Sequence, residues 1–329
     1  MNDIKLWFGC KNLWFEVEYV WIQEVKIMDN LDKTQILTKV LNFGSLNVDY
    51  VYSVDHMVKE GETLSCQEMN IFCGGKGLNQ SIALAKAGVT VYHAGFIGED
   101  GGILLEALQE NGVHTDFVRS LSGRGGHTMI QVDKNGQNSI LVYGGTNRKY
   151  TKEFIDEVLE HFEAGDILML QNEVNLVPYM IERAWEKGMK VVMNPSPYDE
   201  AVNACDFSKI SMFLINEVEG AQMTGETDPE RILEKLCRDY PKAKVVLTLG
   251  EKGSVYQDGE MQYRQGIFPV KTIDTTAAGD TFTGYFIASV MDGLSVPEGL
   301  KLAAKASSIA VSRKGAADSI PFREEVTEC

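Results

Sequence analysis

Between residues 151 and 250 the chain alternates short apolar segments with amphipathic ones, and this alternation constrains its fold more than any other feature. The apolar segments have the length of strands and lie at Ile167–Leu170, Lys190–Met193, Met212–Ile215 and Lys244–Leu249. The segments around them have helical periodicity and lie near 151–162, 176–187, 217–224 and 229–239. Strands that alternate with helices in this way predict a parallel sheet with helices on both faces, which is a three-layer α/β/α core.

The alternation of strands and helices continues before residue 151 and after residue 250. Strands are expected at Val40–Phe43 and Val89–Phe96, and helices at Gly77–Lys86, Ile103–Glu110, about 280–292 and about 297–312. Segments 50–72 and 126–143 instead alternate apolar and polar residues, as half-exposed strands do. We expect them to form a small β-sheet lid over one edge of the core. The predicted class is therefore α/β with a mostly parallel sheet, in one domain over residues 39–329.

Residues 1–38 form an extension that differs from the rest of the chain. Trp7, Trp14 and Trp21 are spaced by seven residues, so one helical face could carry all three. A helix that binds a partner or docks on its own domain fits this pattern, and so does a loosely packed leader. The role of the extension stays open.

Composition excludes several classes of partner. The formal net charge is −16, and an acidic surface repels nucleic acid and anionic membranes, so we expect neither as a partner. The sequence contains no run of 18 apolar residues and no signal-peptide pattern. Its six cysteines have neither Cys-x-x-Cys nor zinc-site spacing, which indicates a reducing compartment. We therefore expect a cytoplasmic protein.

The segment Asp274–Gly284 is the most informative for function, because small residues there lead into an acid that opens an apolar helix. The first N–H groups of a helix lack intrahelical partners and carry the positive end of the helix dipole. Small residues let a phosphate approach these groups closely. Asp280 would then stand where a general base for a substrate hydroxyl belongs. The alternative is an ordinary capped helix after a strand.

A second glycine-rich segment, Gly74–Asn79, lies between the expected lid and a helix. It is neither a Walker A loop nor a dinucleotide-binding motif, and the sequence contains neither, which argues against a P-loop kinase and a Rossmann dehydrogenase. Its glycines permit close backbone approach, while Lys76 and Asn79 offer donors to a polyhydroxylated ligand. The alternative is a plain turn into a helix.

These motifs occur together with others in an order that resembles the ribokinase-like (phosphofructokinase-B-type) carbohydrate kinases. The segments that carry the resemblance are Gly44–Asp49, Gly74–Asn79, Asn216–Glu219, Thr248–Gly253, Asp274–Phe282 and Arg313–Ala316. The resemblance covers roughly residues 40–325. It implies an ATP-dependent kinase for the primary hydroxyl of a sugar, with D-ribose as the expected substrate.

The resemblance also implies roles for individual residues. Asp280 is expected to be the catalytic base, and the amides of Ala277, Ala278, Gly279 and Asp280 to form the anion hole for the transferring phosphate. The expected sugar ligands are Asn47, Asp49, Gly75, Lys76, Gly77, Asn79, Glu173 and Asp280.

Asn216 and Glu219 are expected to position Mg²⁺ and the phosphates through water, and Thr248, Gly250, Gly253 and Gly279 to bind ATP. An activating K⁺ is expected at a site formed by Asp274, Thr276, Ala310, Arg313, Gly315 and Ser319. Most of these cation ligands would be backbone carbonyls.

Alternatives to this function remain open from the sequence. A kinase of the same fold could act on another sugar, a sugar acid or a nucleoside, because substrate choice in such a pocket rests on few contacts. A catalytically silent sugar-binding regulator is the alternative of another class. Lid strands have unpaired edges, so a homodimer through the lid is expected.

Overall fold

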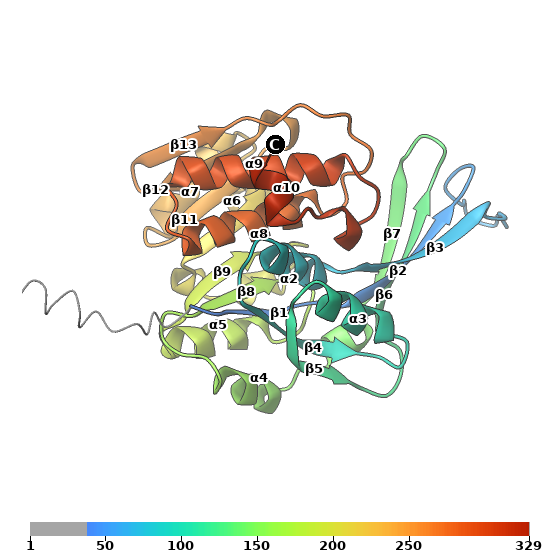
Figure 1. Ribbon diagram of the computed structural model, residues 1–329, viewed down its shortest axis with the longest axis horizontal. Helices are drawn as coiled ribbons and strands as arrows, with labels where there is room; N and C mark the ends of the chain where they lie inside the picture. The colour runs from blue at the N-terminus through green and yellow to red at the C-terminus, as the bar shows by residue number, and fades with distance from the viewer. Residues whose placement is uncertain (1–37, 329) are drawn as a thin grey trace, which may run out of the picture. The chain divides into compact units, whose positions relative to one another are not determined.

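The computed structural model describes residues 38–328, which belong to one compact unit beginning at Thr38 (Figure 1). The Trp-bearing helix expected in the extension lies outside the described residues. Within them, no helix is long and apolar enough to cross a membrane.

A nine-stranded sheet forms the centre of the unit, in the order β13-β12-β11-β10-β9-β8-β1-β4-β5. Neighbours are parallel from β11 to β5, while β12 and β13 add an antiparallel edge. The strands are β1 Val40–Phe43, β4 Val91–Ile97, β5 His114–Ser120, β8 Ile167–Gln171, β9 Lys190–Asn194, β10 Met212–Asn216, β11 Lys244–Thr248, β12 Ser254–Asp258 and β13 Met261–Gln265.

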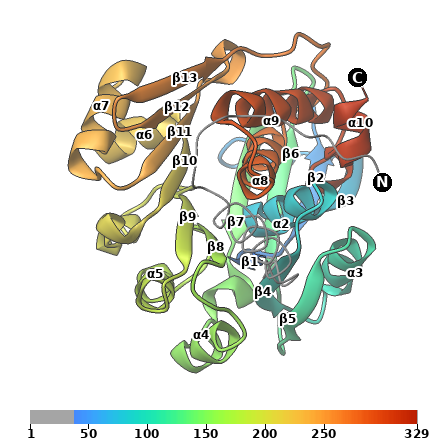
Figure 2. The same cartoon turned by 60° about the vertical axis from the view of Figure 1, so that its left-hand side comes forward.

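Helices cover both faces of this sheet, as Figure 2 shows. One face packs against α2 Lys76–Lys86, α3 Gly102–Glu110, α8 Ala278–Met291, α9 Val296–Val311 and α10 Arg323–Thr327. The other packs against α4 Lys152–Leu159, α5 Val177–Glu186, α6 Glu217–Thr224 and α7 Pro229–Asp239. The predicted three-layer α/β/α core is confirmed.

Successive side chains of the central strands point to opposite faces of the sheet, and each face has its own hydrophobic core. In β8, Leu168 and Leu170 join the core beneath α4 and α5, while Ile167 and Met169 join the core beneath α2 and α8. All four side chains are buried. Strands buried on both faces read as continuous apolar runs, which is why the sequence pattern identified them.

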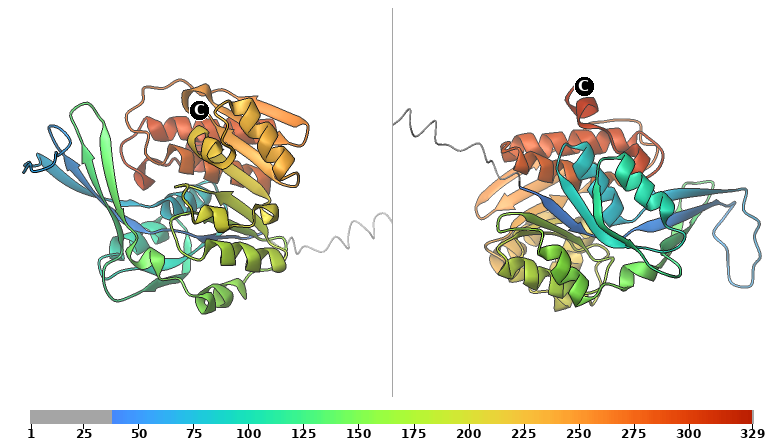
Figure 3. Two further views of the ribbon diagram at one scale, coloured as in Figure 1. Left: turned by 180° about the vertical axis from the view of Figure 1, so that it is seen from behind. Right: turned by 60° about the horizontal axis from the view of Figure 1, so that its bottom comes forward.

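A second sheet of four strands projects from the core, as Figures 1 and 3 show. Its order is β3-β2-β6-β7, with strands at β2 Asn47–Ser53, β3 Glu68–Gly74, β6 Gly126–Val132 and β7 Asn138–Tyr143. We call these four strands the small sheet. The central pair β2 and β6 is parallel, and the outer pairs are antiparallel. Strands β6 and β7 lie within the predicted segment 126–143, whereas β2 begins three residues before the predicted segment 50–72 and β3 ends two residues after it.

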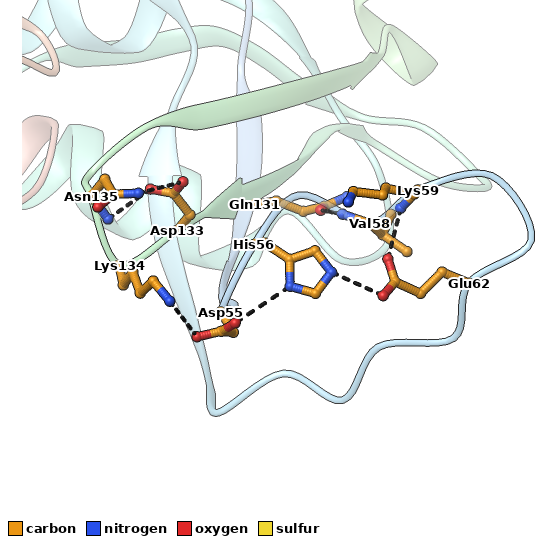
Figure 4. Close-up of polar contacts among 9 residues, drawn as sticks. All are labelled: Asp55, His56, Val58, Lys59, Glu62, Gln131, Asp133, Lys134 and Asn135. Carbon is orange, nitrogen blue, oxygen red and sulfur yellow. Dashed lines mark hydrogen bonds and ion pairs between the residues drawn. The ribbon is translucent and has the colours of Figure 1, made fainter.

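Polar contacts tie together the outer loops of the small sheet (Figure 4). In the loop between β2 and β3, His56 Nε2 lies 2.9 Å from Glu62 Oε1, and its Nδ1 lies 3.4 Å from Asp55 Oδ2. Lys134, in the turn between β6 and β7, donates to Asp55 Oδ1 at 3.1 Å. All these side chains are solvent-accessible, so the contacts order the loops without forming a core.

Candidate active site

A cavity of about 240 Å³ opens at the carboxyl ends of β10 and β11, beside the start of α8. This is where open α/β sheets bind their ligands. Its lining residues are Lys76, Asn194, Leu214, Ile215, Asn216, Glu219, Thr248, Thr275, Ala277, Ala278, Gly279, Asp280 and Thr283. Eight of the residues singled out from the sequence therefore meet at one place: Lys76, Asn216, Glu219, Thr248, Ala277, Ala278, Gly279 and Asp280.

The start of α8 has the geometry of an anion cradle. Ala277, which precedes the helix, has a φ of 59°, a left-handed conformation that few non-glycine residues adopt. Within the described residues, the backbone N–H groups of Gly279 and Asp280 have no acceptor, whereas the N–H of Ala278 donates to Thr275. Apart from its chain neighbours and the nearby backbone of α8 itself, no described atom lies within 4 Å of a Cβ built on Gly279. Two unpaired donors therefore lie at a positive helix end, on residues that line the cavity.

Asp280 lies at the wall of this cavity, with its carboxylate held by two amides. It is 7% exposed. Asn79 Nδ2 donates to its Oδ2 at 3.0 Å, and Gln80 Nε2 donates to its Oδ1 at 2.9 Å. A carboxylate fixed in this way, with lone pairs left over, is suited to accept a proton from a bound hydroxyl.

Lys76 supplies positive charge to the same cavity. Burial alone would lower the pKa of its ammonium group, but the charges of Asp280, Glu173 and Glu219 together raise that pKa above its ordinary value. Lys76 is therefore a cation at neutral pH, in a position where negative charge on a phosphate can be balanced.

Asn47 and Asp49 lie on β2, next to the glycine-rich segment. Asp49 Oδ1 accepts a hydrogen bond from Thr128 Oγ1 at 2.6 Å. The pKa of Asp49 is raised to about 6, chiefly because burial disfavours the charged form; the charge of Glu173 adds to the rise and the Thr128 hydrogen bond opposes it. A Cβ on Gly74 would lie 1.9 Å from Asp49 Oδ2, so only glycine leaves room for this carboxylate.

Asn47 is 3% exposed, and its Oδ1 accepts from Asn147 Nδ2 at 2.8 Å. Because its oxygen is engaged by Asn147, the amide nitrogen of Asn47 remains as a donor for a ligand.

Glu173 joins the end of β1 to the start of α2. Its Oε2 accepts from Ser45 Oγ and, at 2.9 Å, from the backbone N–H of Lys76. Gly75 and Gly77 make this junction possible, since a Cβ on Gly77 would lie 2.3 Å from the nitrogen of Ser45. Both glycines pack closely against the backbone at Ser45, and neither lines the cavity.

Asn216 and Glu219 form a capping box at the start of α6. Asn216 Oδ1 accepts from the Glu219 N–H at 2.9 Å, and Glu219 Oε2 accepts from the Asn216 N–H at 3.0 Å. Glu219 is 5% exposed, so it is not the solvated acid of an ordinary helix start. The capping box and the cavity thus use the same two side chains, and their oxygens are of the kind that Mg²⁺ binds directly or through water.

Thr248 ends β11 beside Asn216 of β10. Gly250 and Gly253 lie in the following turn at φ values of 55° and 92°, and a Cβ on Gly253 would meet Gln265 O at 2.0 Å. Of these three residues only Thr248 lines the cavity.

The residues expected around a monovalent cation lie in the loop before α8 and in the segment from the end of α9 to Ser319, and a hydrogen bond joins these two segments. Asp274 Oδ1 accepts from Thr276 N at 2.9 Å, and its Oδ2 accepts from Gly315 N at 3.1 Å. The Ala310 carbonyl accepts from Arg313 N at 3.0 Å, and Ser319 is fully buried. Among residues 38–328 no group of three His, Cys, Asp or Glu side chains could hold a metal, so a cation here would depend on carbonyl oxygens.

Sequence reasoning missed several residues of the site. Asn194, Thr275 and Thr283 line the cavity, Gln80 donates to Asp280, and Asn147 lies beside Asn47 of β2. Gln80 directly follows Asn79 in the chain, and its two polar neighbours Asn79 and Ser81 were the available signal for a polar face on this helix.

The fold and this cavity define a kinase of small molecules. Residues 37–323 match the pfkB family of carbohydrate kinases, and the chain belongs to this family. It is 35% identical to a ribokinase of Haemophilus influenzae, over 87% of this chain and 96% of that protein. It is 31% identical to a deoxyribokinase of Salmonella typhi, over 87% and 96% respectively. The structure of Arabidopsis thaliana ribokinase complexed with ribose and ATP is similar, with a TM-score of 0.79 and 32% identity over 88% of this chain and 98% of that one.

Proposed function

We propose that this protein is an ATP-dependent kinase that phosphorylates the primary hydroxyl of D-ribose to give ribose 5-phosphate. The observation that carries the proposal is the position of Asp280, whose carboxylate lies beside the unpaired N–H groups of Gly279 and Asp280 at one cavity. A base and an anion cradle at the same spot are the two elements that phosphoryl transfer to an alcohol requires.

In the proposed reaction, Asp280 takes the proton of the sugar hydroxyl while its oxygen attacks the γ-phosphorus of ATP. The new O–P bond forms as the bond to the β-phosphate oxygen breaks, and ADP leaves with that electron pair. The N–H groups at the start of α8 and the Lys76 cation stabilise the charge on the transferring group. Removing one such donor typically costs about 3 kcal/mol of transition-state stabilisation.

Asn216 and Glu219 would hold Mg²⁺ and its waters against the phosphates. When bound, Mg²⁺ neutralises part of the phosphate charge. Thr248 and the turn with Gly250 and Gly253 would contact the nucleotide.

The sugar would bind between the small sheet and α2. Asp49 and Glu173 can each accept from two adjacent hydroxyls, which suits a vicinal diol. Asn79 supports this placement, because its Oδ1 is buried and has no hydrogen-bond partner among the described residues, while its Nδ2 is used by Asp280. A sugar hydroxyl pointing at Oδ1 would satisfy it. Asn47, Lys76 and the backbone around Gly75 and Gly77 complete the proposed sugar site.

We also propose that K⁺ activates the enzyme from the loops of Asp274 and Gly315. These loops are joined by the Asp274–Gly315 hydrogen bond, and the Asp274 loop directly precedes the anion cradle. A cation held by the carbonyls near Thr276, Ala310, Arg313 and Ser319 would order that cradle. Replacing K⁺ by Na⁺ should lower kcat, and an unchanged kcat would count against the site.

A homodimer through the small sheet is proposed from its exposed apolar side chains. By register, Leu141 and Tyr143 of β7 share a face with Met69 of β3, and these side chains are 68%, 54% and 48% exposed. Two small sheets packed together would cover them. Sedimentation of the wild type and of Leu141→Asp would test this, because the variant should be monomeric. The four described cysteines are free, which is compatible with the cytoplasmic location that we propose.

The most informative experiment is a panel of sugars and nucleosides with ATP, measured as ADP formation. Ribose should give the highest kcat/KM, and 2-deoxyribose, another pentose or a nucleoside in its place would identify another kinase of the family. Asp280→Asn, with its fold confirmed by circular dichroism, should lose far more than tenfold in kcat. Wild-type protein that binds ribose without forming ADP would instead favour a silent regulator.

A further inference from the structure

A continuous chain of buried polar side chains runs from Asp280 into the interior of the protein. Each member after Asp280 is at most 1% exposed, and each is reached from the one before through a side-chain hydrogen bond. After Asp280 the members are Gln80, Gln171, Asn42, Ser81 and His93, which come from α2, β8, β1 and β4. The sugar, the nucleotide and the cation sites proposed above do not use these five residues.

The direction of the hydrogen bonds is set at Asn42, which is anchored by a backbone carbonyl. Asn42 Nδ2 donates to the Gly77 carbonyl at 2.9 Å and to Ser81 Oγ at 2.8 Å, so its Oδ1 must accept. Gln171 Nε2 donates to that Oδ1 at 3.1 Å and to Gln80 Oε1 at 2.6 Å. An amide nitrogen can only donate and an amide oxygen can only accept.

The orientation of the Gln80 amide follows from these bonds. With its Oε1 engaged by Gln171, its Nε2 must face the carboxylate of Asp280 at 2.9 Å and Asn194 Oδ1 at 3.3 Å. If the amide were reversed, Gln80 Oε1 would lie at hydrogen-bond distance from a carboxylate oxygen, and two acceptors would repel each other in a buried place.

Asp280 consequently has one donor on each carboxylate oxygen, Asn79 on Oδ2 and Gln80 on Oδ1. One bond would leave the carboxylate free to turn about its own axis, and the second removes that freedom. We propose that Gln80 is a positioning residue that holds the general base in its reactive orientation, and that Gln171 and Asn42 hold Gln80. This inference rests on the proposed role of Asp280 as the base.

The test compares kcat, KM for ribose and the thermal unfolding midpoint of three variants. Gln80→Met keeps the length of the side chain but cannot donate, and Gln171→Met removes the donor that orients Gln80. Ser81→Ala is the matched control, because Ser81 is a fully buried member of the same chain on the same helix and its side chain bonds neither Gln80 nor Gln171. Without the Ser81 hydroxyl, the Asn42 amide is still oriented by its bond to the Gly77 carbonyl. We expect kcat to fall roughly 10- to 100-fold in the first two variants, with KM within about threefold of wild type. Ser81→Ala should lower the unfolding midpoint and leave kcat within twofold.

A second measurement separates positioning from a merely structural effect. In the Asp280→Asn background the base is absent, so adding Gln80→Met or Gln171→Met should change the residual kcat by less than twofold. A loss of the same factor in both backgrounds would overturn the inference, because a general distortion acts whether or not a base is present. If Gln80→Met does not fold, Gln171→Met carries the same comparison.

The outcomes distinguish this inference from the proposed function. If Asp280→Asn is inactive while Gln80→Met and Gln171→Met stay within twofold of wild-type kcat, the positioning role is wrong and the base stands. If Asp280→Asn keeps its turnover, Asp280 is not the base, and the positioning role falls with it.

Discussion

The Asp49 carboxylate should lower the free energy of unfolding at neutral pH although it serves the sugar site. Asp49→Asn should therefore be more stable than wild type. The pKa of this carboxyl is about 6 in the folded protein against 3.8 in an unfolded chain. The folded state therefore holds the proton more tightly. Stability from this group is fully present below pH 3.8 and is lost as the pH rises through about 6. This difference of about two units between the two pKa values corresponds to about 3 kcal/mol of unfolding free energy.

The substitution keeps the shape of the side chain and an oxygen that can accept from Thr128, but it removes the charge from this half-buried position. At about pH 7.5 we expect Asp49→Asn to be more stable than wild type by about 3 kcal/mol, and below about pH 4 the two should unfold alike. Urea unfolding at a series of pH values measures this directly. The same variant should bind ribose poorly, because its one amide oxygen already accepts from Thr128 and its amide nitrogen can only donate.

Asp116→Asn is the matched control, since its side chain is 64% exposed and its loss changes the net charge equally. Its unfolding free energy should follow wild type at every pH. The reasoning is refuted if Asp49→Asn is no more stable than wild type at pH 7.5. It is equally refuted if the difference between the two does not change with pH.

Three further predictions concern backbone space and the outer loops. Gly279→Ala should fold normally, because no described atom outside its chain neighbours and the nearby α8 backbone lies within 4 Å of the added Cβ. Its methyl group should nevertheless obstruct the anion cradle and lower kcat roughly 100-fold, and calorimetry and steady-state kinetics would check both expectations. Gly77→Ala should destabilise the protein by about 2–3 kcal/mol or prevent folding, because its Cβ would lie 2.3 Å from a backbone nitrogen; a normal urea midpoint would contradict this. The carboxylates of Glu62 and Asp55 raise the pKa of His56, so His56 stabilises the loop below the ordinary histidine pKa and loses this effect as the pH rises through the raised value. Proteolysis within residues 54–67 should therefore become faster from about pH 6 to about pH 8.5 in wild type, and His56→Gln should lack this increase.

The central strands and most helices could be predicted because each carries its own local pattern. The predicted β1, Val40–Phe43, and the helix predicted at 217–224 have the bounds that the structure gives. Strands β5, β12 and β13 were not predicted. All but one of the side chains of β13 are exposed, so this strand has no apolar run to mark it. The available signal was the turn at Asp258-Gly259, where Gly259 adopts a φ of 56° between two short alternating strands.

Some residues of the site could likewise be predicted from a local motif, whereas others are brought to the site only by contacts between distant parts of the chain. Asp280 and the small residues before it are adjacent in sequence, so a motif could indicate the base and the anion cradle together. The donor on Asp280 Oδ1 comes from Gln80, which is 200 positions away, and its orientation is set by Gln171 and Asn42 on two other strands. No periodicity within α2 encodes that partnership, because it exists only once the strand order places β1 and β8 side by side beneath the helix.

The sequence motif located the glycines of Gly74–Asn79 but did not predict which contacts require them. Close approach to a ligand was the reason first given for them. In the structure Gly74 makes room for the Asp49 carboxylate, and Gly77 lets α2 begin against the backbone of Ser45. That contact sets where α2 starts, and therefore where Asn79 and Gln80 project toward Asp280. The glycines thus act on the reaction through the position of the helix, so their substitution should alter the geometry of the base before it alters any contact with the sugar.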